Sequence, residues 1–296
     1  MSQLEKLKLN HTDQARKREF VQQKENGFFN CRIVTGNGKL TAEEGIKICE
    51  LAKQYGDGEI AFATRQTVEI MGISRENLDL VKKEITEMGL IMGEIGPKIK
   101  PIVACKGSNC QYGLIDTFAL AEKLHQLFFV RYHDVELPNK FKITVSGCAN
   151  KCVKPELNDI GIVGQLIPQI RSEKCVNCKE CVIERKCEMH AVYKAGGKIH
   201  IDTKACTHCG QCMNQCEYGV ISSGISGYKL YIGGRWGKEI KAGYPLSKII
   251  LGEEQLLSVI ERAIALYKES GNQGERFADV IQRIGNAEVE KILLGE

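Results

Sequence analysis

Residues 175–187 have the sequence CVNCKECVIERKC, and residues 206–216 have the sequence CTHCGQCMNQC. Each stretch places three cysteines at two-residue gaps and a fourth cysteine further along, so the two stretches are copies of one unit. Three thiolates at this spacing wrap around one [4Fe–4S] cluster, and the fourth thiolate reaches across to the neighbouring cluster. The pattern therefore predicts a small module that holds two clusters of the bacterial ferredoxin type.

The same rule divides the eight thiolates of this module into two ligand sets. We expect one cluster on Cys175, Cys178, Cys181 and Cys216, and the other on Cys206, Cys209, Cys212 and Cys187. The alternative is a pair of structural zinc sites, but zinc typically takes two CxxC pairs separated by a longer spacer. The first unit has five residues before its last cysteine in place of the usual three, which lengthens one loop without removing a ligand.

The composition of the whole chain indicates what kind of protein carries this module. The chain has 296 residues, of which 43% are hydrophobic and 26% charged, as in an ordinary globular protein. No apolar run approaches the ~18 residues that span a bilayer, and residues 1–20 lack the apolar stretch of a secretory signal. We therefore expect a cytoplasmic protein without a membrane span. In a reducing compartment its fourteen cysteines are better explained as metal ligands than as disulfides.

Residues 28–104 predict an α+β unit of the ferredoxin-like kind. Their elements are expected in the order β-α-β-β-α-β, with strands at 28–34, 59–64, 67–72 and 100–104. Thr41-Ala-Glu-Glu44 is a capping box that opens the first helix, which has Ile46 on its inner side and ends at Gly56. Ser74 is expected to cap the second helix.

Regular structure continues beyond this unit and is interrupted by the cysteine-rich stretch. We expect a helix at 116–129, strands at 141–146, 159–164 and 228–232, and C-terminal helices at 253–268, 274–284 and 286–294. The predicted domains are therefore a helical lead-in at 1–27, the ferredoxin-like half-domain at 28–104, a second domain at 105–166 and 217–296, and the inserted module at 167–216.

Four more cysteines form two spaced pairs in the second domain: Cys105, Cys110, Cys148 and Cys152. Taken alone, this spacing leaves zinc ligands and buried thiols as open alternatives. Cys31 and Cys49 remain after these twelve, and we expect both to be thiols of the core.

The residues around the two pairs resemble the nitrite/sulfite reductase family. The resemblance rests on VACKGSNC at 103–110, LPNKFKITVSGCANKC at 137–152, DIGIVG at 159–164, ATRQT at 63–67 and GGRWG at 233–237. It covers residues 28–296 with the cysteine-rich module as an insertion. Within the family, the chain is most similar to the form with such an insertion, the catalytic subunit of anaerobic sulfite reductase.

The resemblance implies the cofactors and the residues that would bind them. The four paired cysteines would hold a third [4Fe–4S] cluster, and Cys152 would also bridge to the iron of a sirohaem. Substrate binding and proton donation are implied for Arg32, Lys100, Lys140 and Lys142, and contacts to the cofactor for Thr64, Arg65 and Arg235. Lys140 and Lys142 alternate along a predicted strand that leads to Cys148, so they are expected on one face of it.

The activity implied by the resemblance is the six-electron reduction of sulfite to sulfide, of the dissimilatory or anaerobic type. Electrons would enter at the inserted module and reach the sirohaem through Cys152. One alternative is reduction of nitrite to ammonia in the same family. Another is a non-catalytic electron-transfer subunit with three clusters and no sirohaem, although such a subunit has no need of the basic residues.

The partners expected for this chain follow from what the sequence lacks. No nucleotide-binding fingerprint for NADH or flavin is present, so a separate electron-donor protein or partner subunits are expected. The net charge of +4 is spread along the chain, which suits an anionic cofactor and substrate and argues against nucleic acid. Larger family members carry the repeat twice, whereas this chain has one copy of each motif, so the resemblance implies a homodimer.

Overall fold

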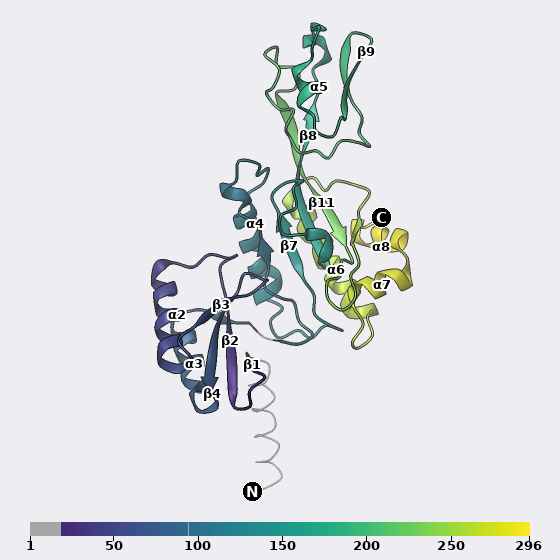
Figure 1. Ribbon diagram of the computed structural model, residues 1–296. Coiled ribbons are helices and arrows are strands. Elements are labelled where there is room, and N and C mark those ends of the chain that lie inside the picture. The colour runs from purple at the N-terminus through teal and green to yellow at the C-terminus, as the bar shows by residue number, and fades with distance from the viewer. Residues whose placement is uncertain (1–18, 94) are drawn as a thin grey trace. The chain divides into compact units, whose positions relative to one another are not determined.

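The computed structural model describes residues 19–93 and 95–296 (Figure 1). The chain divides into two compact units. The first ends at Val103 and also takes in residues 121–143 and 271–276, and the second comprises residues 104–120, 144–270 and 277–296. The first unit is thus built from three segments of the chain, two of which come after Val103.

The first unit is built on an antiparallel sheet with two helices. Its elements are β1 (Phe20–Gln22), β2 (Phe28–Val34), α2 (Ala42–Tyr55), β3 (Ile60–Phe62), β4 (Val68–Ser74), α3 (Leu78–Glu87) and β5 (Ile91–Met92). β2 pairs with β4, β4 pairs with β3, and β5 pairs with the end of β2, all antiparallel. This order, β5-β2-β4-β3, is the ferredoxin-like arrangement predicted from the sequence.

Local sequence signals explain helix α2. The Thr41 side chain accepts a hydrogen bond from the Glu44 N–H, and the Glu44 carboxylate accepts one from the Thr41 N–H, so the predicted capping box is formed. The buried face of α2 carries Ile48, Leu51 and Ala52, which join residues of α3, β2 and β4 in one apolar core. Ile46, expected on the inner side, is 62% exposed because it lies one helical step away from that face.

Three other expectations for this unit are wrong. The fourth strand of the sheet is β5, whereas Val103–Ala104 forms β6 of a second sheet. Within the expected helical lead-in, Phe20–Gln22 forms strand β1 because it pairs with β2, and residues 1–18 lie outside the described part of the chain. Ser74 makes no capping hydrogen bond and precedes a 3-10 turn at Arg75–Asn77.

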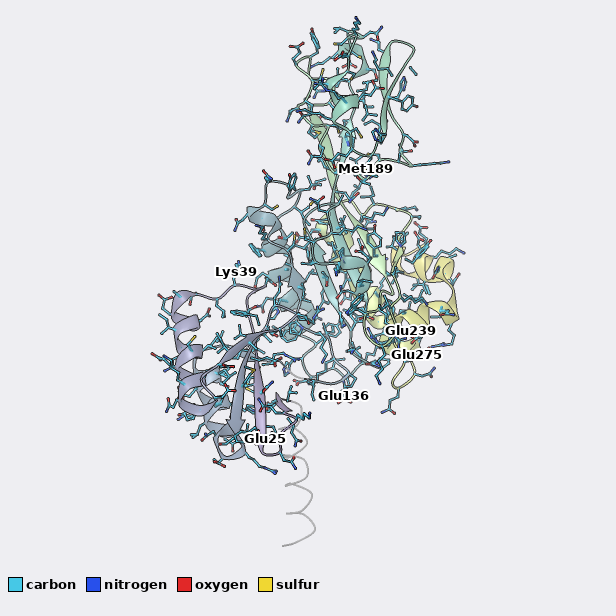
Figure 2. The ribbon with its side chains drawn as sticks, in the orientation of Figure 1. Glu25, Lys39, Glu136, Met189, Glu239 and Glu275 are labelled. Atoms are coloured by element: carbon cyan, nitrogen blue, oxygen red, sulfur yellow. The ribbon has the colours of Figure 1, made fainter. Side chains whose placement is uncertain are left out.

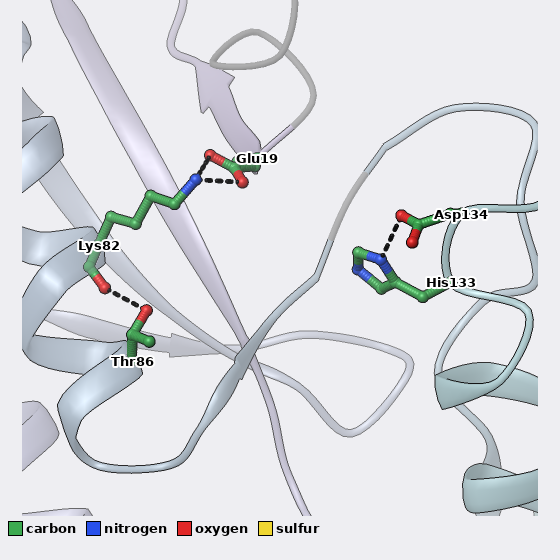
Figure 3. Close-up of polar contacts among 5 residues, drawn as sticks. All are labelled: Glu19, Lys82, Thr86, His133 and Asp134. Atoms are coloured by element: carbon green, nitrogen blue, oxygen red, sulfur yellow. Dashed lines mark hydrogen bonds and ion pairs between the residues drawn. The ribbon is translucent and has the colours of Figure 1, made fainter.

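Polar contacts tie further segments to the first unit (Figure 3). The Lys82 ammonium on α3 lies 2.6 Å from the Glu19 carboxylate, which precedes β1. The Thr86 hydroxyl donates to the Lys82 carbonyl at 2.8 Å, within the same helix. His133 Nδ1 lies 3.2 Å from the carboxylate of Asp134 in the segment 121–143. These surface contacts contribute little stability singly, and of the three the Lys82–Glu19 pair is the one that joins residues far apart in the sequence.

The second sheet has the order β12-β11-β8-β7-β6. Its further strands are β7 (Ile143–Ser146), β8 (Ile160–Gln169), β11 (Ser223–Ile232) and β12 (Tyr244–Pro245). The C-terminal helices α6 (Glu253–Ser270), α7 (Phe277–Ile284) and α8 (Asn286–Leu294) match the predicted ranges closely. Helix α4 (Thr117–Leu124) continues as a π-helical segment at His125–Val130, and 3-10 turns lie at Gly107–Asn109, Pro155–Leu157 and Ser172–Lys174.

Residues 170–222 form a small cysteine-rich segment between β8 and β11 (Figure 1). The antiparallel ladder of these strands runs from Ile160–Ile232 to Gln169–Ser223, so the segment begins and ends later than the expected 167–216. It contains α5 (Val182–Lys186), β9 (Val192–Ala195) and β10 (Lys198–Ile201). Its core consists of five buried aliphatic residues: Ile183, Val192, Ile199, Val220 and Ile221.

No helix among residues 19–93 and 95–296 has the length and apolar character needed to cross a membrane.

Candidate functional site

The first candidate site is formed by two loops that follow β6 and β7. Cys105 follows β6, and its N–H donates to the Val145 carbonyl at 3.0 Å, while Cys148 follows β7 after Ser146 and Gly147. The Gly147 N–H points at the Cys105 Sγ at 3.1 Å, so the two loops meet at these residues. The sheet therefore brings Cys105 and Cys148 together although 42 residues separate them in the sequence.

Glycines allow this close approach. A Cβ on Gly107 would lie 2.6 Å from the Thr117 Cγ2 and 3.0 Å from the Gly147 Cα, distances that real Cβ atoms do not show or scarcely show. The Thr117 hydroxyl donates to the Cys105 carbonyl at 2.7 Å and fixes the first loop to the start of α4. A side chain at Gly107 would push the loops apart.

Electrostatics show that the four thiols of these loops are neighbours. The pKa of Cys148 is raised above its usual value, chiefly by burial, while the Asn150 N–H opposes the rise and the charges of Cys105, Cys152 and Cys110 add to it. Cys148 is buried and Cys152 exposed. Burial favours the protonated form of the Cys148 thiol, so metal binding at this thiol would release a proton.

The eight cysteines of the segment 170–222 line two cavities. One cavity of about 300 Å³, here called the inner site, is lined by Cys187, Cys206, Cys209 and Cys212. The other, of about 400 Å³ and here called the outer site, is lined by Cys175, Cys178, Cys181 and Cys216. These are the two sets that the sequence predicts, each with its fourth cysteine supplied by the other unit.

The inner site borders the ligand loop of the first candidate site. Ala149 and Asn150, which lie between Cys148 and Cys152, line the same cavity as Cys187 and Cys206. The Leu166 N–H donates to the His208 carbonyl at 2.9 Å and fixes this part of the segment to β8. No residue of the loops 105–110 and 148–152 lines the outer site.

The thiols of these sets stand around cavities and do not converge on one point. Within the described ranges 19–93 and 95–296, no group of three or more His, Cys, Asp or Glu is arranged to hold a single metal ion. Burial raises the pKa of Cys212 to about 11, with a further contribution from the charge of Cys206. Each cavity is lined by four cysteines, which is the number of thiolates that a [4Fe–4S] cluster takes.

A basic cavity of about 220 Å³ lies in the first unit. Six predicted site residues line it: Arg32, Thr64, Arg65, Lys100, Lys140 and Lys142. Thr67 also lines it, and its buried hydroxyl has no hydrogen-bond partner among the described residues. Concentrated positive charge and an unsatisfied hydroxyl fit an anionic group with oxygen acceptors.

The two arginines of this cavity are held differently. Arg32 on β2 makes two contacts to the Glu69 carboxylate on β4, at 2.8 Å through Nε and 2.6 Å through Nη2. Arg65 donates to the carbonyls of Pro101, at 2.6 and 3.0 Å, and Ile143, at 3.0 Å. Glu69 thus neutralises part of the charge of Arg32, while backbone carbonyls orient the guanidinium of Arg65.

The three lysines reach the cavity from neighbouring extended segments. The Lys100 N–H donates to the Phe141 carbonyl at 2.8 Å, which sets Lys100 beside the segment that carries Lys140 and Lys142. Phe141 is fully buried and the flanking lysines are half-buried, so the predicted alternation is confirmed. Strand β7 begins only at Ile143, so both lysines precede the strand on which they were expected.

Arg235 and the two remaining cysteines complete the predicted residues. Arg235 lies in the second unit, 2.8 Å from Glu239 and 3.3 Å from Asp279, so two carboxylates already neutralise it (Figure 2 labels Glu239). Cys31 is a core thiol as expected, and burial raises its pKa to about 12. The expectation for Cys49 is wrong, because α2 turns this thiol outward and leaves it exposed.

Two residues of the basic cavity were not found from the sequence. Glu69 binds Arg32 across the β2–β4 pair, and Thr67 enters through the turn between β3 and β4. The contact between Glu69 and Arg32 forms only because β2 pairs with β4 in a register that places the two residues opposite each other. The sequence signal for this contact was the acidic residue Glu69 in β4, because side chains of opposite charge attract across paired strands.

The chain combines a ferredoxin-like sheet that carries a basic cavity with a second sheet that carries paired cysteine loops. The model of the nitrite and sulphite reductase 4Fe-4S domain matches residues 95–295, and that of the nitrite/sulfite reductase ferredoxin-like half domain matches residues 21–88. The chain therefore belongs to the nitrite/sulfite reductase family, which binds a [4Fe–4S] cluster and sirohaem.

Two proteins of one archaeon match most of this chain. The chain is 30% identical over 261 residues to the coenzyme F420-dependent sulfite reductase of Methanocaldococcus jannaschii, covering 87% of this chain and 40% of that protein. It is 31% identical over 257 residues to an uncharacterized protein of the same organism, covering 87% of this chain and 88% of that protein. The chain thus spans less than half of the first relative and most of the second.

A solved structure shows the same fold. Dissimilatory sulfite reductase I matches with a TM-score of 0.72 at 22% identity, over 90% of this chain and 69% of that chain. At this identity the likeness concerns the fold alone.

Proposed function

We propose that this chain is the catalytic subunit of a sulfite reductase of the dissimilatory or anaerobic type, which reduces sulfite to sulfide with six electrons. The observation that carries the proposal is the basic cavity with Arg65, Lys140 and Lys142, in a chain that also has the paired cysteine loops of the family. A subunit that only transfers electrons has no need for such a cavity. The names of the relatives support sulfite as the substrate.

The residues of the cysteine sets would hold three [4Fe–4S] clusters. Cys105, Cys110, Cys148 and Cys152 would hold the family cluster, and the inner and outer sites one cluster each. The clusters supply one-electron transfer, and sirohaem supplies the iron at which the substrate is reduced. The segment 170–222 is, on this proposal, a bacterial-type ferredoxin module inserted into the β8–β11 hairpin.

The cationic side chains of the basic cavity would bind the substrate oxygens and supply protons. Lys140 and Lys142 present ammonium groups, each of which can donate a hydrogen bond to a sulfite oxygen and pass on a proton as that oxygen leaves as water. Arg65 and Thr64 would contact carboxylates of the cofactor, while its backbone hydrogen bonds keep the Arg65 guanidinium oriented.

An absorption spectrum of the anaerobically purified protein tests the proposal first, because sirohaem has visible bands that iron–sulfur clusters lack. Turnover of sulfite and nitrite, each supplied with the same reductant, then identifies the preferred anion. Sirohaem bands together with preferred sulfite turnover support the proposal. Spectra of clusters alone would indicate an electron-transfer subunit, and preferred nitrite turnover would indicate the other activity of the family.

The proposal extends to a two-fold homodimer, because the chain has one copy of each motif that larger family members carry twice. In such a dimer the basic cavity of one protomer would face the cofactor bound through Cys152 of its partner. Mixing a Lys140→Ala chain with a Cys152→Ser chain tests this arrangement. Shared sites restore activity in the mixed dimer because one site has both sets intact, whereas sites built within single chains restore none.

A further inference from the structure

Two lysines of the segment 170–222 bind the main chain of the outer-site ligand loop. The Lys194 Nζ donates to the Cys178 carbonyl at 2.8 Å and to the Lys179 carbonyl at 3.4 Å. The Lys198 Nζ donates to the Cys175 carbonyl at 3.0 Å. Both lysines are only half exposed or less, and Lys194 lines the outer site itself. Two positive charges are therefore fixed against the loop that carries three of the four outer thiols.

A tight hairpin holds these two lysines in place. β9 and β10 pair with Lys198 opposite Ala195, so the connection is the two-residue turn Gly196-Gly197. Both glycines have positive φ, 56° and 74°, as a type I′ turn requires. The Cys175 Sγ lies 4.0 Å from the Gly197 carbonyl, so the turn itself contacts the ligand loop. The hairpin is built against the outer site, and the ammonium positions follow from its register.

Other charges near the outer site are more exposed. Glu180 and Glu217 line the cavity as well. The Glu180 side chain is 84% exposed and lies 3.8 Å from Arg185, and Glu217 is exposed and hydrogen-bonds Tyr218. Solvent and salt screen exposed carboxylates strongly, whereas half-buried ammonium groups on ligand carbonyls are screened less. The two lysines are therefore the charged groups that are hydrogen-bonded to the main chain of the outer ligand loop.

The inner site lacks this feature. Neither Lys nor Arg is among its described lining residues, and the charged residue that does line it is Glu188. Its other polar neighbours are Thr207, His208 and Gln211. The inner and outer sites, which arise from two copies of one sequence unit, thus differ in the charged side chains that lie next to them.

We propose that Lys194 and Lys198 are positioning residues that raise the reduction potential of the outer cluster relative to the inner one. The inference rests on the proposed function, since it requires a cluster on Cys175, Cys178, Cys181 and Cys216. Reduction adds one electron and no proton to a cluster, so the reduced cluster carries one more negative charge. A fixed positive charge nearby stabilises that charge and favours the reduced state. The outer cluster then collects electrons from the donor.

A redox titration of the full-length protein with all its clusters, followed by electron paramagnetic resonance, measures the effect. Dithionite and mediators supply the electrons. The outer-cluster signal is identified as the one lost in Cys178→Ala. At the wild-type midpoint of this cluster, Lys194→Gln and Lys198→Gln should each lower the ratio of reduced to oxidised cluster about tenfold, which is about 59 mV for a one-electron couple.

Two controls separate charge from structure. Lys194→Arg keeps the charge and should leave the outer midpoint close to the wild-type value. Lys238→Gln removes the same charge from an exposed side chain outside the segment and should shift the outer midpoint by a small fraction of the main effect. The inner-cluster midpoint should change less than the outer one in the Lys194 and Lys198 variants.

The inference is overturned by an unchanged outer midpoint in both Gln variants, or by equal shifts in Lys194→Gln and Lys194→Arg. Loss of the outer cluster in both Gln variants also overturns it, because the lysines would then be needed for assembly. Iron analysis of the wild-type protein keeps this failure apart from failure of the proposed function. A wild-type chain without clusters refutes the proposed function, whereas unaffected potentials in a loaded chain refute this inference alone.

Discussion

The first unit and the cysteine-rich segment 170–222 obtain their stability from different sources. The core of the first unit has twelve buried residues contributed by the sheet and both helices. The segment has five buried aliphatic residues, and five cysteines pack against them. A core of that size cannot offset the conformational entropy of about fifty residues. Apolar burial therefore folds the first unit, whereas the segment needs another source of stability, which the clusters of the proposed function would supply.

Removal of the clusters should produce the largest difference in stability between the first unit and the segment 170–222. Chelation of iron under mild oxidation should leave the segment without its main source of stability, so β9, β10 and α5 should unfold. The amides of the first unit should keep their protection. Hydrogen exchange followed by mass spectrometry of the loaded and stripped protein measures both regions in one sample. Equal protection of residues 170–222 in the two forms would show that the apolar core is sufficient.

Truncation of a core side chain should destabilise the first unit next most strongly. Ile70 on β4 is fully buried in the apolar core, so Ile70→Ala removes buried apolar surface and leaves a cavity. The expected cost is about 2–5 kcal/mol of unfolding free energy. Ile46→Ala, on the exposed face of α2, is the matched control and should cost little. Denaturant unfolding measures both, and comparable losses would contradict the assignment of the core.

The lysines of the basic cavity should affect turnover more than stability. Lys140→Ala and Lys142→Ala each remove a charge-assisted contact to a bound anion, worth on the order of 2–4 kcal/mol, or roughly 30- to 1,000-fold in rate. Lys83→Ala is the control, because the Lys83 side chain is 69% exposed and faces Glu87 on α3. Sulfite turnover at equal sirohaem content is the measurement. Wild-type rates in both variants would remove these lysines from the active site.

The smallest expected effect is on the pH dependence of the stability of the second unit, outside the segment 170–222. Burial alone would raise the pKa of Glu290, but hydrogen bonds from Ser247 and Tyr244 and the charge of Lys248 outweigh it and lower this pKa below 4.5. A carboxyl with a lowered folded pKa stabilises the fold above its unfolded pKa and loses that contribution as pH falls through the folded pKa. Glu290→Gln should therefore cost about 1–3 kcal/mol at pH 7.

Thermal unfolding between pH 7 and pH 3 tests the role of Glu290. The wild-type and Glu290→Gln curves should converge as the pH falls through the lowered pKa of Glu290, where the wild-type carboxyl becomes protonated. A difference that stays constant across this range would show that the carboxylate charge is not what stabilises the site. Glu288→Gln on the same helix is the control, because its side chain is 59% exposed.

Local signals predicted much of this molecule. The capping box of Thr41 and Glu44 forms as expected, and the spacing of the cysteines predicted which thiols line each of the two cavities. The capping box depends on residues close in sequence, and the assignment of the cysteines depends on the ligand spacing of [4Fe–4S] clusters. The alternation of Lys140 and Lys142 around Phe141 also follows from neighbours in the chain.

Contacts between distant residues were not predicted. The fourth strand of the first sheet was assigned to residues 100–104 because Val103 and Ala104 are apolar, but the short strand β5 occupies that place. Phe20 was assigned to a helical lead-in, whereas its pairing with Cys31 makes it part of a strand. The contact of Glu69 with Arg32 depends on the register of two strands. A single sequence carries little information about such pairings.

The antiparallel ladder of β8 and β11 has a consequence for how such a chain can be made. Gln169 and Ser223 are directly paired, so the fifty-three residues between them enter and leave the sheet at adjacent positions. A module attached in this way occupies the position of a hairpin turn and can be exchanged as a cassette without altering the register of the host strands. Replacing residues 170–222 by Asn-Gly would close an ordinary two-residue hairpin. On the proposed function the segment is a portable electron-transfer module, and a reductase of this architecture could be fitted for a different donor by grafting at a single turn.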